Sequence, residues 1–311
     1  MKITQVKWKN HPILGDLFLD FKNSSTNSPY ETIIFAGENG TGKSTILENI
    51  SSLLNADSFE YFDYVSYVTD EGKFFKAVPT SDGNTHKSFF DLIDENQKQI
   101  KVRTDRNNNR DKMDSNLDDL RSYGCVYSRA RADYKTKKIT TTTTSSLDKE
   151  KYDIDGSDDF TSLKQLIVDV VNQDNNEYAE VNKTLGAVPK SWDDFYPDSN
   201  LFRFKNAFDN FFDKLSYGKV TDIDNEKTII FTKNGLLIPV DKLSTGEKQI
   251  VFRGIYLLRN SDLLNGSAIL VDEPELSMHP KWQQRILAYY KELFTKNNVS
   301  VQSTPHFHPN R

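Results

Sequence analysis

Three short segments of the chain combine glycine, hydroxyl, lysine and carboxylate groups at spacings suited to chemistry on a nucleoside triphosphate. The first segment, residues 37–45, reads Gly-Glu-Asn-Gly-Thr-Gly-Lys-Ser-Thr and fits the pattern G-x-x-x-x-G-K-[ST]. Its glycines let the backbone curl so that successive N–H groups point at phosphate oxygens. The candidate ATP-binding residues of this phosphate loop are Gly37, Asn39, Gly40, Gly42, Lys43, Ser44 and Thr45.

The residues on both sides of the loop have the patterns that such a loop needs. The apolar run 32–36 before it predicts a buried strand, and the segment after it predicts an amphipathic helix. The apolar positions of that helix are Ile46, Leu47, Ile50, Leu53 and Leu54. We expect Lys43 to reach the β- and γ-phosphates and Ser44 to ligate Mg²⁺. The alternative, a structural glycine turn, leaves this Lys-Ser pair unexplained.

The second segment places two carboxylates at the end of a short apolar run. Residues 268–271 read Ala-Ile-Leu-Val and are followed by Asp272 and Glu273. An uninterrupted apolar run predicts a strand of a parallel sheet, buried on both faces, and ligands bind at the carboxyl ends of such strands. Asp272 is the candidate Mg²⁺ ligand, and Glu273 is the candidate base that orients the attacking water. Taken alone, the pair could also be a solvated acidic turn.

The third segment, residues 243–247, reads Leu-Ser-Thr-Gly-Glu. A helix is expected after it, so Ser244 should cap that helix. The Ser244 hydroxyl, the Gly246 N–H and the helix dipole would then form an anion site. The alternative is an ordinary capped helix. The expected apolar positions of the helix are Ile250, Val251, Ile255, Leu257 and Leu258.

Together, in this order, the three segments resemble the ABC-type ATPase superfamily. The resemblance implies an α/β fold of the P-loop NTPase class, with a mixed central sheet, an antiparallel β lobe and a helical insertion. We expect one head over residues 1–311, with lobe I at 1–134, a flexible loop and helical insertion at 135–215, and lobe II at 216–311.

The Thr-Gly-Glu form of the third segment is more similar to SMC-like and OLD-like ATPases than to transporter cassettes. The 198 positions from Thr45 to Leu243 are too many for a transporter cassette, and sustained heptads of long SMC proteins are missing. This length resembles the stand-alone bacterial AAA-type group that includes OLD, Septu and retron-associated ATPases.

The resemblance implies a homodimer, or a higher even oligomer, that closes on ATP. Ser244, Gly246 and Glu247 of one subunit would meet the γ-phosphate of ATP held by the other subunit. Closure would gate a separate effector, such as a nuclease, in defence against phage. The five histidines form no cluster of the H-N-H kind, so the effector is expected to be another polypeptide.

Two further segments match the superfamily less closely. Residues 275–280 resemble the D-loop, which passes between subunits. The resemblance also implies a strand at 299–302 followed by a switch histidine. His306 is the candidate, with His308 second, and a disordered tail is the alternative. Since the family continues with more helix and strand, the chain is expected to be a shortened or altered version, with slow hydrolysis.

Three other functions remain open: a DNA-maintenance ATPase of SMC or recombination type, a transporter cassette, and a scaffold that binds ATP but barely hydrolyses it. A basic stretch could contact nucleic acid or could be a solvated face; it consists of Arg121, Arg129, Arg131, Lys135, Lys137 and Lys138. The glutamine that usually lies between the lobes is not identified, and Gln97, Gln99 and Arg129 are the candidates.

Composition limits the class of protein. The formal charge of −5 gives no global basic field that would attract nucleic acid. Because Cys125 is the single cysteine, a disulfide framework and a cysteine-based zinc site are excluded. The first eight residues alternate like a strand rather than a signal peptide, and no run approaches the roughly 20 apolar residues of a membrane span. We therefore expect a cytoplasmic protein with no membrane partner.

The remaining elements follow from local patterns. We expect a hairpin over 61–79, a polar loop with one helix over 94–119, a strand at 124–128 and helices over 160–215. Asn234-Gly235 predicts a second hairpin between strands at 228–231 and 236–240.

Overall fold

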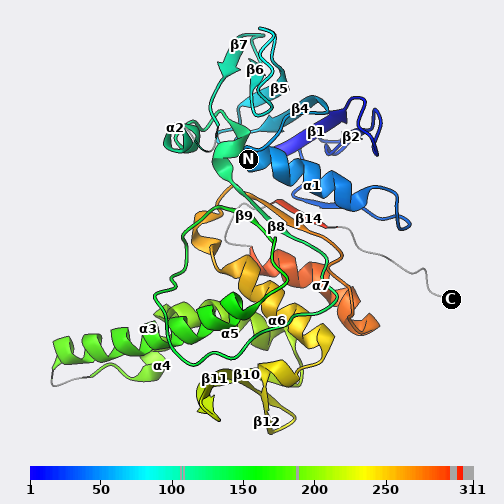
Figure 1. Cartoon of the computed structure of the whole chain (residues 1–311). Helices are drawn as coiled ribbons and strands as arrows, with labels where there is room; N and C mark the ends of the chain where they lie inside the picture. Colours follow the sequence, from blue (N-terminus) through cyan, green and yellow to red (C-terminus); the bar gives the residue numbers. More distant parts are fainter. Residues whose placement is uncertain (106, 108, 187–188, 295–299, 304–311) are drawn as a thin grey trace.

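The computed structural model describes residues 1–105, 107, 109–186, 189–294 and 300–303, the last four as backbone only. A parallel sheet lies at the centre of the molecule, with an antiparallel sheet above it and a group of helices below it (Figure 1). The fold is thus mixed α/β, as the sequence predicts.

The central sheet has five parallel strands in the order β3-β14-β13-β8-β9. Their bounds are Thr32–Ile34, Ser300–Ser303, Ala268–Val271, Cys125–Ser128 and Tyr152–Ile154. Because neighbouring strands are parallel, their carboxyl ends meet at one edge, where Val271 of β13 is paired with Ser128 of β8. This edge receives both the phosphate loop, which follows β3, and the acidic pair, which follows β13.

The burial of these strands confirms one prediction and corrects another. All four residues of β13 are buried, as its apolar run predicts. The run before the phosphate loop does not form a buried strand, because β3 lies at the edge of the sheet and pairs on one side only. Its residue Ile34 is 42% exposed.

The antiparallel sheet has six strands in the order β2-β1-β4-β5-β6-β7. Their bounds are Phe18–Asp20, Lys2–Trp8, Phe62–Val68, Phe74–Pro79, Phe90–Asp94 and Gln99–Val102. The hairpin predicted over 61–79 is formed by β4 and β5. The prediction of a polar loop with one helix over 94–119 is wrong where β7 lies. This short strand pairs with β6, but its polar residues give no strand pattern in the sequence. The helix of that segment is α2, Arg110–Asp114, and a 3-10 turn, η1, follows at Leu120–Tyr123.

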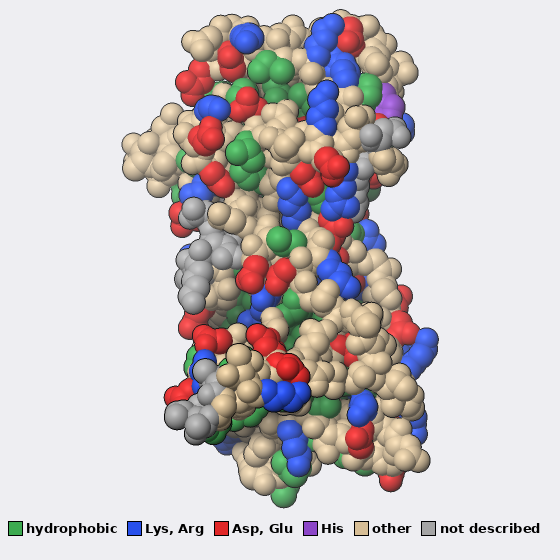
Figure 2. Space-filling view, turned by 90° about the vertical axis from the view of Figure 1, so that its left-hand side faces the viewer, with side chains coloured by type: hydrophobic (Ala, Val, Ile, Leu, Met, Phe, Trp, Pro, Cys, Tyr) green, Lys and Arg blue, Asp and Glu red, His purple; other side chains and the backbone are tan. Residues whose placement is uncertain are grey.

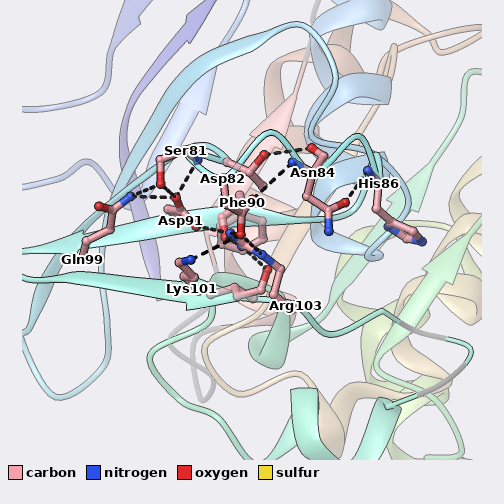
Figure 3. Close-up of polar contacts among 11 residues, drawn as sticks. Ser81, Asp82, Asn84, His86, Phe90, Asp91, Gln99, Lys101 and Arg103 are labelled. Atoms are coloured by element: carbon pink, nitrogen blue, oxygen red, sulfur yellow. Dashed lines mark hydrogen bonds and ion pairs between the residues drawn. The ribbon is translucent and has the colours of Figure 1, made fainter.

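A buried carboxylate fixes the β5–β6 connection of this sheet (Figure 3). Asp91 on β6 is fully buried and accepts hydrogen bonds from the backbone and hydroxyl of Ser81, at 2.9 and 2.8 Å. Its other partners come from β7 and the residue after it: Gln99 Nε2 at 2.7 Å and Arg103 Nη2 at 2.7 Å. Arg103 also pairs with Asp82 at 2.8 Å, so one network holds together the far end of the sheet.

The helices lie on both faces of the central sheet. Their bounds are Lys43–Leu54 for α1, Thr161–Leu185 for α3, Trp192–Phe195 for α4, Asn200–Phe211 for α5, Thr245–Leu258 for α6 and Pro280–Leu293 for α7. Short 3-10 turns are η2 at Tyr196–Asp198, η3 at Val240–Lys242 and η4 at Ser261–Leu263. The prediction of helices over 160–215 is confirmed by α3, α4 and α5. Figure 1 shows the far end of α3 extending away from the rest of the molecule.

A third sheet leads into α6. It is antiparallel in the order β10-β11-β12, with bounds Leu215–Ile223, Glu226–Lys233 and Leu236–Pro239. The hairpin predicted around Asn234-Gly235 is confirmed, and both turn residues have positive φ, 49° and 82°. This backbone is typical of a type I′ turn.

Two hydrophobic cores use the two faces of the parallel sheet. On one face, Tyr127 and Leu270 pack with α1 and the antiparallel sheet. On the other face, Val126 and Ile269 pack with α3, α5, α6 and α7. The apolar positions predicted for α1 and α6 are all buried, so each helix packs as its sequence pattern predicts.

Candidate nucleotide-binding site

The phosphate loop has the backbone that its glycines permit. Gly40 and Gly42 have φ values of 83° and 89°, a region that other residues rarely adopt. Gly42 is also the residue before α1, and a Cβ atom there would lie 2.7 Å from Leu14 Cδ2. A side chain at this position would therefore both strain the turn and collide with the β1–β2 loop.

Two side chains hold the loop in its curled form. Lys43 Nζ donates to the carbonyl oxygens of Gly37 and Glu38, at 2.9 and 2.8 Å. Thr41 Oγ1 donates to the same Glu38 carbonyl at 2.9 Å. Lys43 as a residue is 9% exposed, and the two hydrogen bonds place its ammonium within the loop. This places a cation where a chain of phosphates would need one.

The end of β13 that carries Asp272 and Glu273, here called the acidic edge, faces this loop across the sheet. β14 separates β3 from β13. Two strand spacings amount to about 10 Å, which leaves room for a phosphate chain between the loop and the carboxylates. Asp272 continues the pairing of β13, because its N–H donates to Ser128 O at 2.9 Å, and it is 5% exposed.

The residues at this edge fit the Mg²⁺ and triphosphate that the sequence predicts. Ser44 lies in the first turn of α1, directly after the glycine turn whose Gly40 and Gly42 have positive φ. Within the described part of the chain, no cluster of three or more His, Cys, Asp or Glu side chains could hold a metal ion by itself. Mg²⁺ does not require one, since it is commonly held by one or two protein ligands, water and the phosphates of the substrate.

Glu273 has an unusual backbone. Its φ is 42°, in the left-handed region that non-glycine residues enter at a cost of about 1–3 kcal/mol. The surrounding structure supports this conformation through Arg253 of α6, whose Nη1 donates to the Glu273 carbonyl at 3.2 Å. Strained residues of this kind concentrate at functional sites, so the conformation itself marks the end of β13 as a candidate functional site.

Arg253 links two neighbouring strand ends to one helix. Its side chain is 1% exposed, and its Nη2 donates to the carbonyl of Arg129, which follows β8, at 2.8 Å. Burial alone would lower the pKa of Arg253, but nearby Tyr134 and Tyr290 raise it above its usual value. The guanidinium is therefore charged, and it donates hydrogen bonds to the backbone carbonyls of Arg129, which follows β8, and Glu273, which follows β13.

A second polar group lies on the α1 side of this edge. Burial raises the pKa of the Tyr127 hydroxyl, and the negative charges of Asp272 and Glu48 raise it further. Arg129 stacks over the Tyr127 ring and lies 4.0 Å from Glu48. Its side chain is half-exposed.

Among the three candidates for the contact between the lobes, the geometry favours Arg129. Gln97 lies in the turn between β6 and β7, and Gln99 is occupied by Asp91 and Ser81 (Figure 3). Both belong to the far end of the antiparallel sheet, whereas Arg129 follows a strand of the central sheet.

The third segment forms the start of α6, as predicted. Ser244 caps the helix in a reciprocal capping box with Glu247. Ser244 N and Oγ donate to Glu247 Oε2 at 2.9 and 2.8 Å, and Glu247 N donates weakly to Ser244 Oγ at 3.4 Å. The Glu247 carboxylate is buried and also pairs with Lys233 of β11 at 2.6 Å.

Gly246 lets the segment at 275–280 approach the start of α6. A Cβ atom at Gly246 would lie 2.8 Å from the carbonyl oxygen of Ser277. Ser277 has a φ of 63°, and His279 then caps α7 by accepting from Lys281 N at 3.2 Å. The segment that resembles a D-loop therefore packs directly on the third segment.

Of the predicted strand and switch histidine, the structure describes only the strand. The strand expected at 299–302 is β14, which pairs with β3 and β13 over Ser300–Ser303. His306 and His308 lie outside the described residues.

Half of the basic stretch is neutralised by aspartates. Arg121 is buried against Asp119 at 2.7 Å. Arg131 pairs with Asp155 at 2.9 Å and also with Asp158, and Lys137 pairs with Asp159 at 2.6 Å; these pairs leave fewer cations of the stretch for contact with nucleic acid. On the face drawn in Figure 2, acidic and basic side chains are likewise interspersed. In the part of the chain that the structure describes, no helix is long and apolar enough to cross a bilayer.

Sequence reasoning missed two residues of this region. Lys233 could have been suspected, because Ser-x-x-Glu at 244–247 is a capping-box pattern and its buried carboxylate needs a partner. The sequence carried no signal for Arg253, since its position in the helix says nothing about which backbone oxygens it meets.

Comparisons with known proteins agree with this geometry. The chain is 25% identical over 346 residues to "Retron Vc95 probable ATPase" of Vibrio cholerae serotype O1 biovar El Tor, covering 88% of the chain and 66% of that protein. It is 28% identical over 147 residues to "Retron Ec83 probable ATPase" of Escherichia coli, covering 44% of the chain and 23% of that protein. The chain thus spans less than two thirds of the length of each relative.

Among solved structures, similar folds occur in "Crystal structure of the SmcHead bound to the C-winged helix domain of ScpA" and in "SMC head domain from Thermotoga maritima". Both are 12% identical and cover 99% of this chain and 90% of the other, with TM-scores of 0.48 and 0.43. Because these scores are low, the fold assignment rests on the strand order and the loop geometry.

A family profile matches residues 33–301, which include the phosphate loop, the start of α6 and the acidic edge. Its description is "AAA domain, putative AbiEii toxin, Type IV TA system". The match spans most of the chain and agrees with the ABC-type resemblance of the three segments. The chain therefore belongs to this AAA-domain family, and its three segments resemble those of ABC-type ATPase heads.

Proposed function

We propose that the chain binds ATP with Mg²⁺, closes as a head-to-tail homodimer and hydrolyses the bound ATP. The observation that carries this proposal is the meeting of two features at one edge of the parallel sheet. One is the phosphate loop closed by Lys43, and the other is Glu273, held in a left-handed backbone by Arg253.

Within one subunit, each residue has a task that its position supports. Lys43 would exchange its bonds with loop carbonyls for bonds with phosphate oxygens. Ser44 and Asp272 would hold Mg²⁺, which when bound neutralises charge on the phosphates. Glu273 would accept a proton from the attacking water, and Arg253 would keep its backbone in place.

Between subunits, the start of α6 would complete the site. Ser244, the backbone N–H groups of the first turn and the helix dipole would receive the γ-phosphate of ATP bound to the partner. Two such sites would form in a symmetric pair, because each subunit offers one loop and one α6. Closure is then the output, and hydrolysis resets it.

We further propose that closure gates a separate effector protein, such as a nuclease, in defence against phage. The similarity to two retron-associated probable ATPases supports this role. Because the chain spans less than two thirds of those proteins, their full activity is not transferred to it. The paired basic stretch gives less support to the rival role in DNA maintenance.

Turnover of the Glu273→Gln variant tests the hydrolytic part of the proposal. Glutamine keeps the shape of the side chain but cannot accept the proton, so ATP hydrolysis should fall by on the order of 10²–10⁴. ATP affinity, measured by calorimetry, should stay close to that of the parent. Glu60→Gln, at a surface ion pair with Lys87, is the matched control and should hydrolyse like the parent.

Two outcomes would contradict this assignment. If Glu273→Gln hydrolyses ATP like the parent, the base is another residue. If the parent itself binds ATP without measurable hydrolysis, the chain is the nucleotide-dependent scaffold that the sequence left open.

A further inference from the structure

The proposed phosphate site at the start of α6 contains a negative charge of its own. The carboxylate of Glu247 lies beside the helix N-terminus, where it accepts both the N–H and the hydroxyl of Ser244. Its side chain is 5% exposed, so water screens it poorly. A γ-phosphate arriving at Ser244 would therefore meet a carboxylate of the same sign at close range.

A carboxylate in this place weakens the attraction of the helix N-terminus for an anion. The donors and the dipole of the first turn attract negative charge, but Glu247 already uses part of that attraction within its own chain. Like charges that approach across an interface in a poorly screened setting oppose association. A trans phosphate site built around Glu247 therefore needs a compensating cation.

Lys233 provides this cation. Its Nζ lies 2.6 Å from Glu247 Oε1, on the oxygen that Ser244 does not use. Burial raises the pKa of Glu247, but the hydrogen bond from Lys233 and those from Ser244 outweigh it and leave the pKa below its usual value. Glu247 is thus ionised at neutral pH, and the pair as a whole carries no net charge.

The fold presents Lys233 to this site with little freedom. Lys233 is the last residue of β11 and is paired with Leu215 of β10 on one side and Leu236 of β12 on the other. The tight Asn234-Gly235 turn follows directly. The side chain is 35% exposed, so the ammonium bridges the buried carboxylate and the surface that a partner subunit would meet.

We infer that Lys233 is a positioning residue of the trans phosphate site, which neutralises Glu247 so that Ser244 and the start of α6 can receive the triphosphate of ATP bound to a second copy of the chain. This inference rests on the proposed function. It assigns to the β10-β11-β12 sheet a part in ATP-driven association, although the sheet contains none of the three sequence segments.

The test measures ATP-driven association in the Glu273→Gln background, where hydrolysis does not interfere. Lys233→Met should raise the protein concentration for half-association with Mg²⁺-ATP about tenfold or more, because Glu247 is left uncompensated. Lys233→Arg, which keeps the charge, should associate like the background protein. Lys227→Met, on the same strand at an exposed pair with Asp222, is the control and should have no effect.

A second substitution separates charge from structure. Glu247→Gln added to Lys233→Met removes the uncompensated carboxylate, so association should recover most of what Lys233→Met lost. Calorimetry should show unchanged ATP affinity in each monomer, because the phosphate loop is intact. Thermal unfolding without ATP records any loss of folding stability separately.

The outcomes are distinguishable. Normal association of Lys233→Met, or a double variant that associates no better than Lys233→Met, would overturn the compensating role. If the Glu273→Gln background itself does not associate with ATP, the proposed function fails instead, and the role inferred for Lys233 fails with it.

Discussion

At the scale of single residues, contacts with backbone oxygens hold part of the nucleotide edge in place. Glu273 and Ser277 both have positive φ, within one short segment after β13. Such conformations persist only where neighbours hold them. Arg253 does so for Glu273, and Ser277 lies against Gly246, where a Cβ atom would come within 2.8 Å of the Ser277 carbonyl oxygen.

This arrangement makes Arg253 important for turnover rather than for ATP binding. Arg253→Met keeps most of the side-chain volume but removes the bonds to the carbonyls of Glu273 and Arg129. Without them the Glu273 backbone can relax, so hydrolysis should fall on the order of tenfold to a hundredfold. Steady-state kinetics measure the effect, and ATP affinity from calorimetry should change little.

A variant at the C-cap of the same helix provides the control. Arg259 pairs with Asp153 and does not contact Glu273, so Arg259→Met should lower folding stability while the surviving folded protein hydrolyses ATP normally. If the two variants lose turnover in proportion to their loss of stability, Arg253 has no specific role at the edge.

The residues that sequence could identify are those whose chemistry is local. The loop at 37–45 carries its glycines, lysine and serine in consecutive positions, and the acidic pair adjoins its own strand. Lys233 and Arg253 act across distances of 14 and 20 positions in the chain, through a hairpin and a helix packing. Spacing alone does not encode contacts of that kind.

At the scale of elements, periodicity predicted strands and helices correctly where apolar residues recur. It failed where hydrogen bonds of polar side chains attach a strand to its neighbour. α1, α6 and the two hairpins follow their patterns. β7 does not, because its attachment depends on Gln99 and on the buried Asp91 of the neighbouring strand. β3 was predicted to be buried because an apolar run does not reveal that a strand lies at the edge.

The Asp91 network makes the antiparallel sheet sensitive to acid. The hydrogen bond from Arg103 is the main cause that lowers the pKa of Asp82 to about 2. Burial raises the pKa of Asp91, but hydrogen bonds from the Ser81 backbone and from Arg103 outweigh it, so this pKa is lowered as well. An unfolded aspartate titrates near pH ~3.9, so the stabilisation is present above that pH and is lost as pH falls toward about 2.

Urea unfolding at several pH values tests this. The free energy of unfolding of the parent should fall steeply from about pH 4 to about pH 2, whereas Arg103→Met should be less stable at pH 7 and should show a shallower fall. Lys101→Met, which removes a longer contact of 3.5 Å to Asp82, should resemble the parent. Parallel pH profiles for the parent and Arg103→Met would show that the network does not control acid stability.

At the scale of the whole molecule, the parallel sheet joins two cores with different tasks. The core on one face includes α1, which starts at the phosphate loop, and the core on the other includes α6, which Ser244 caps (Figure 1). A subunit therefore holds its loop and its α6 on opposite faces of one sheet. This arrangement suits a pair of subunits in which each loop meets the other subunit's α6.

The most direct test of this account is the mass of the Glu273→Gln variant in solution, measured by light scattering with and without Mg²⁺-ATP. We predict a monomer without nucleotide and a dimer, or a higher even oligomer, with it. Adding Ser244→Arg should leave ATP binding to each monomer intact but abolish the association, because a bulky cation would fill the site for the partner's phosphate. Lys43→Ala should also remain monomeric, because it cannot retain ATP. Association of the Ser244→Arg variant equal to that of Glu273→Gln alone would contradict the trans phosphate site.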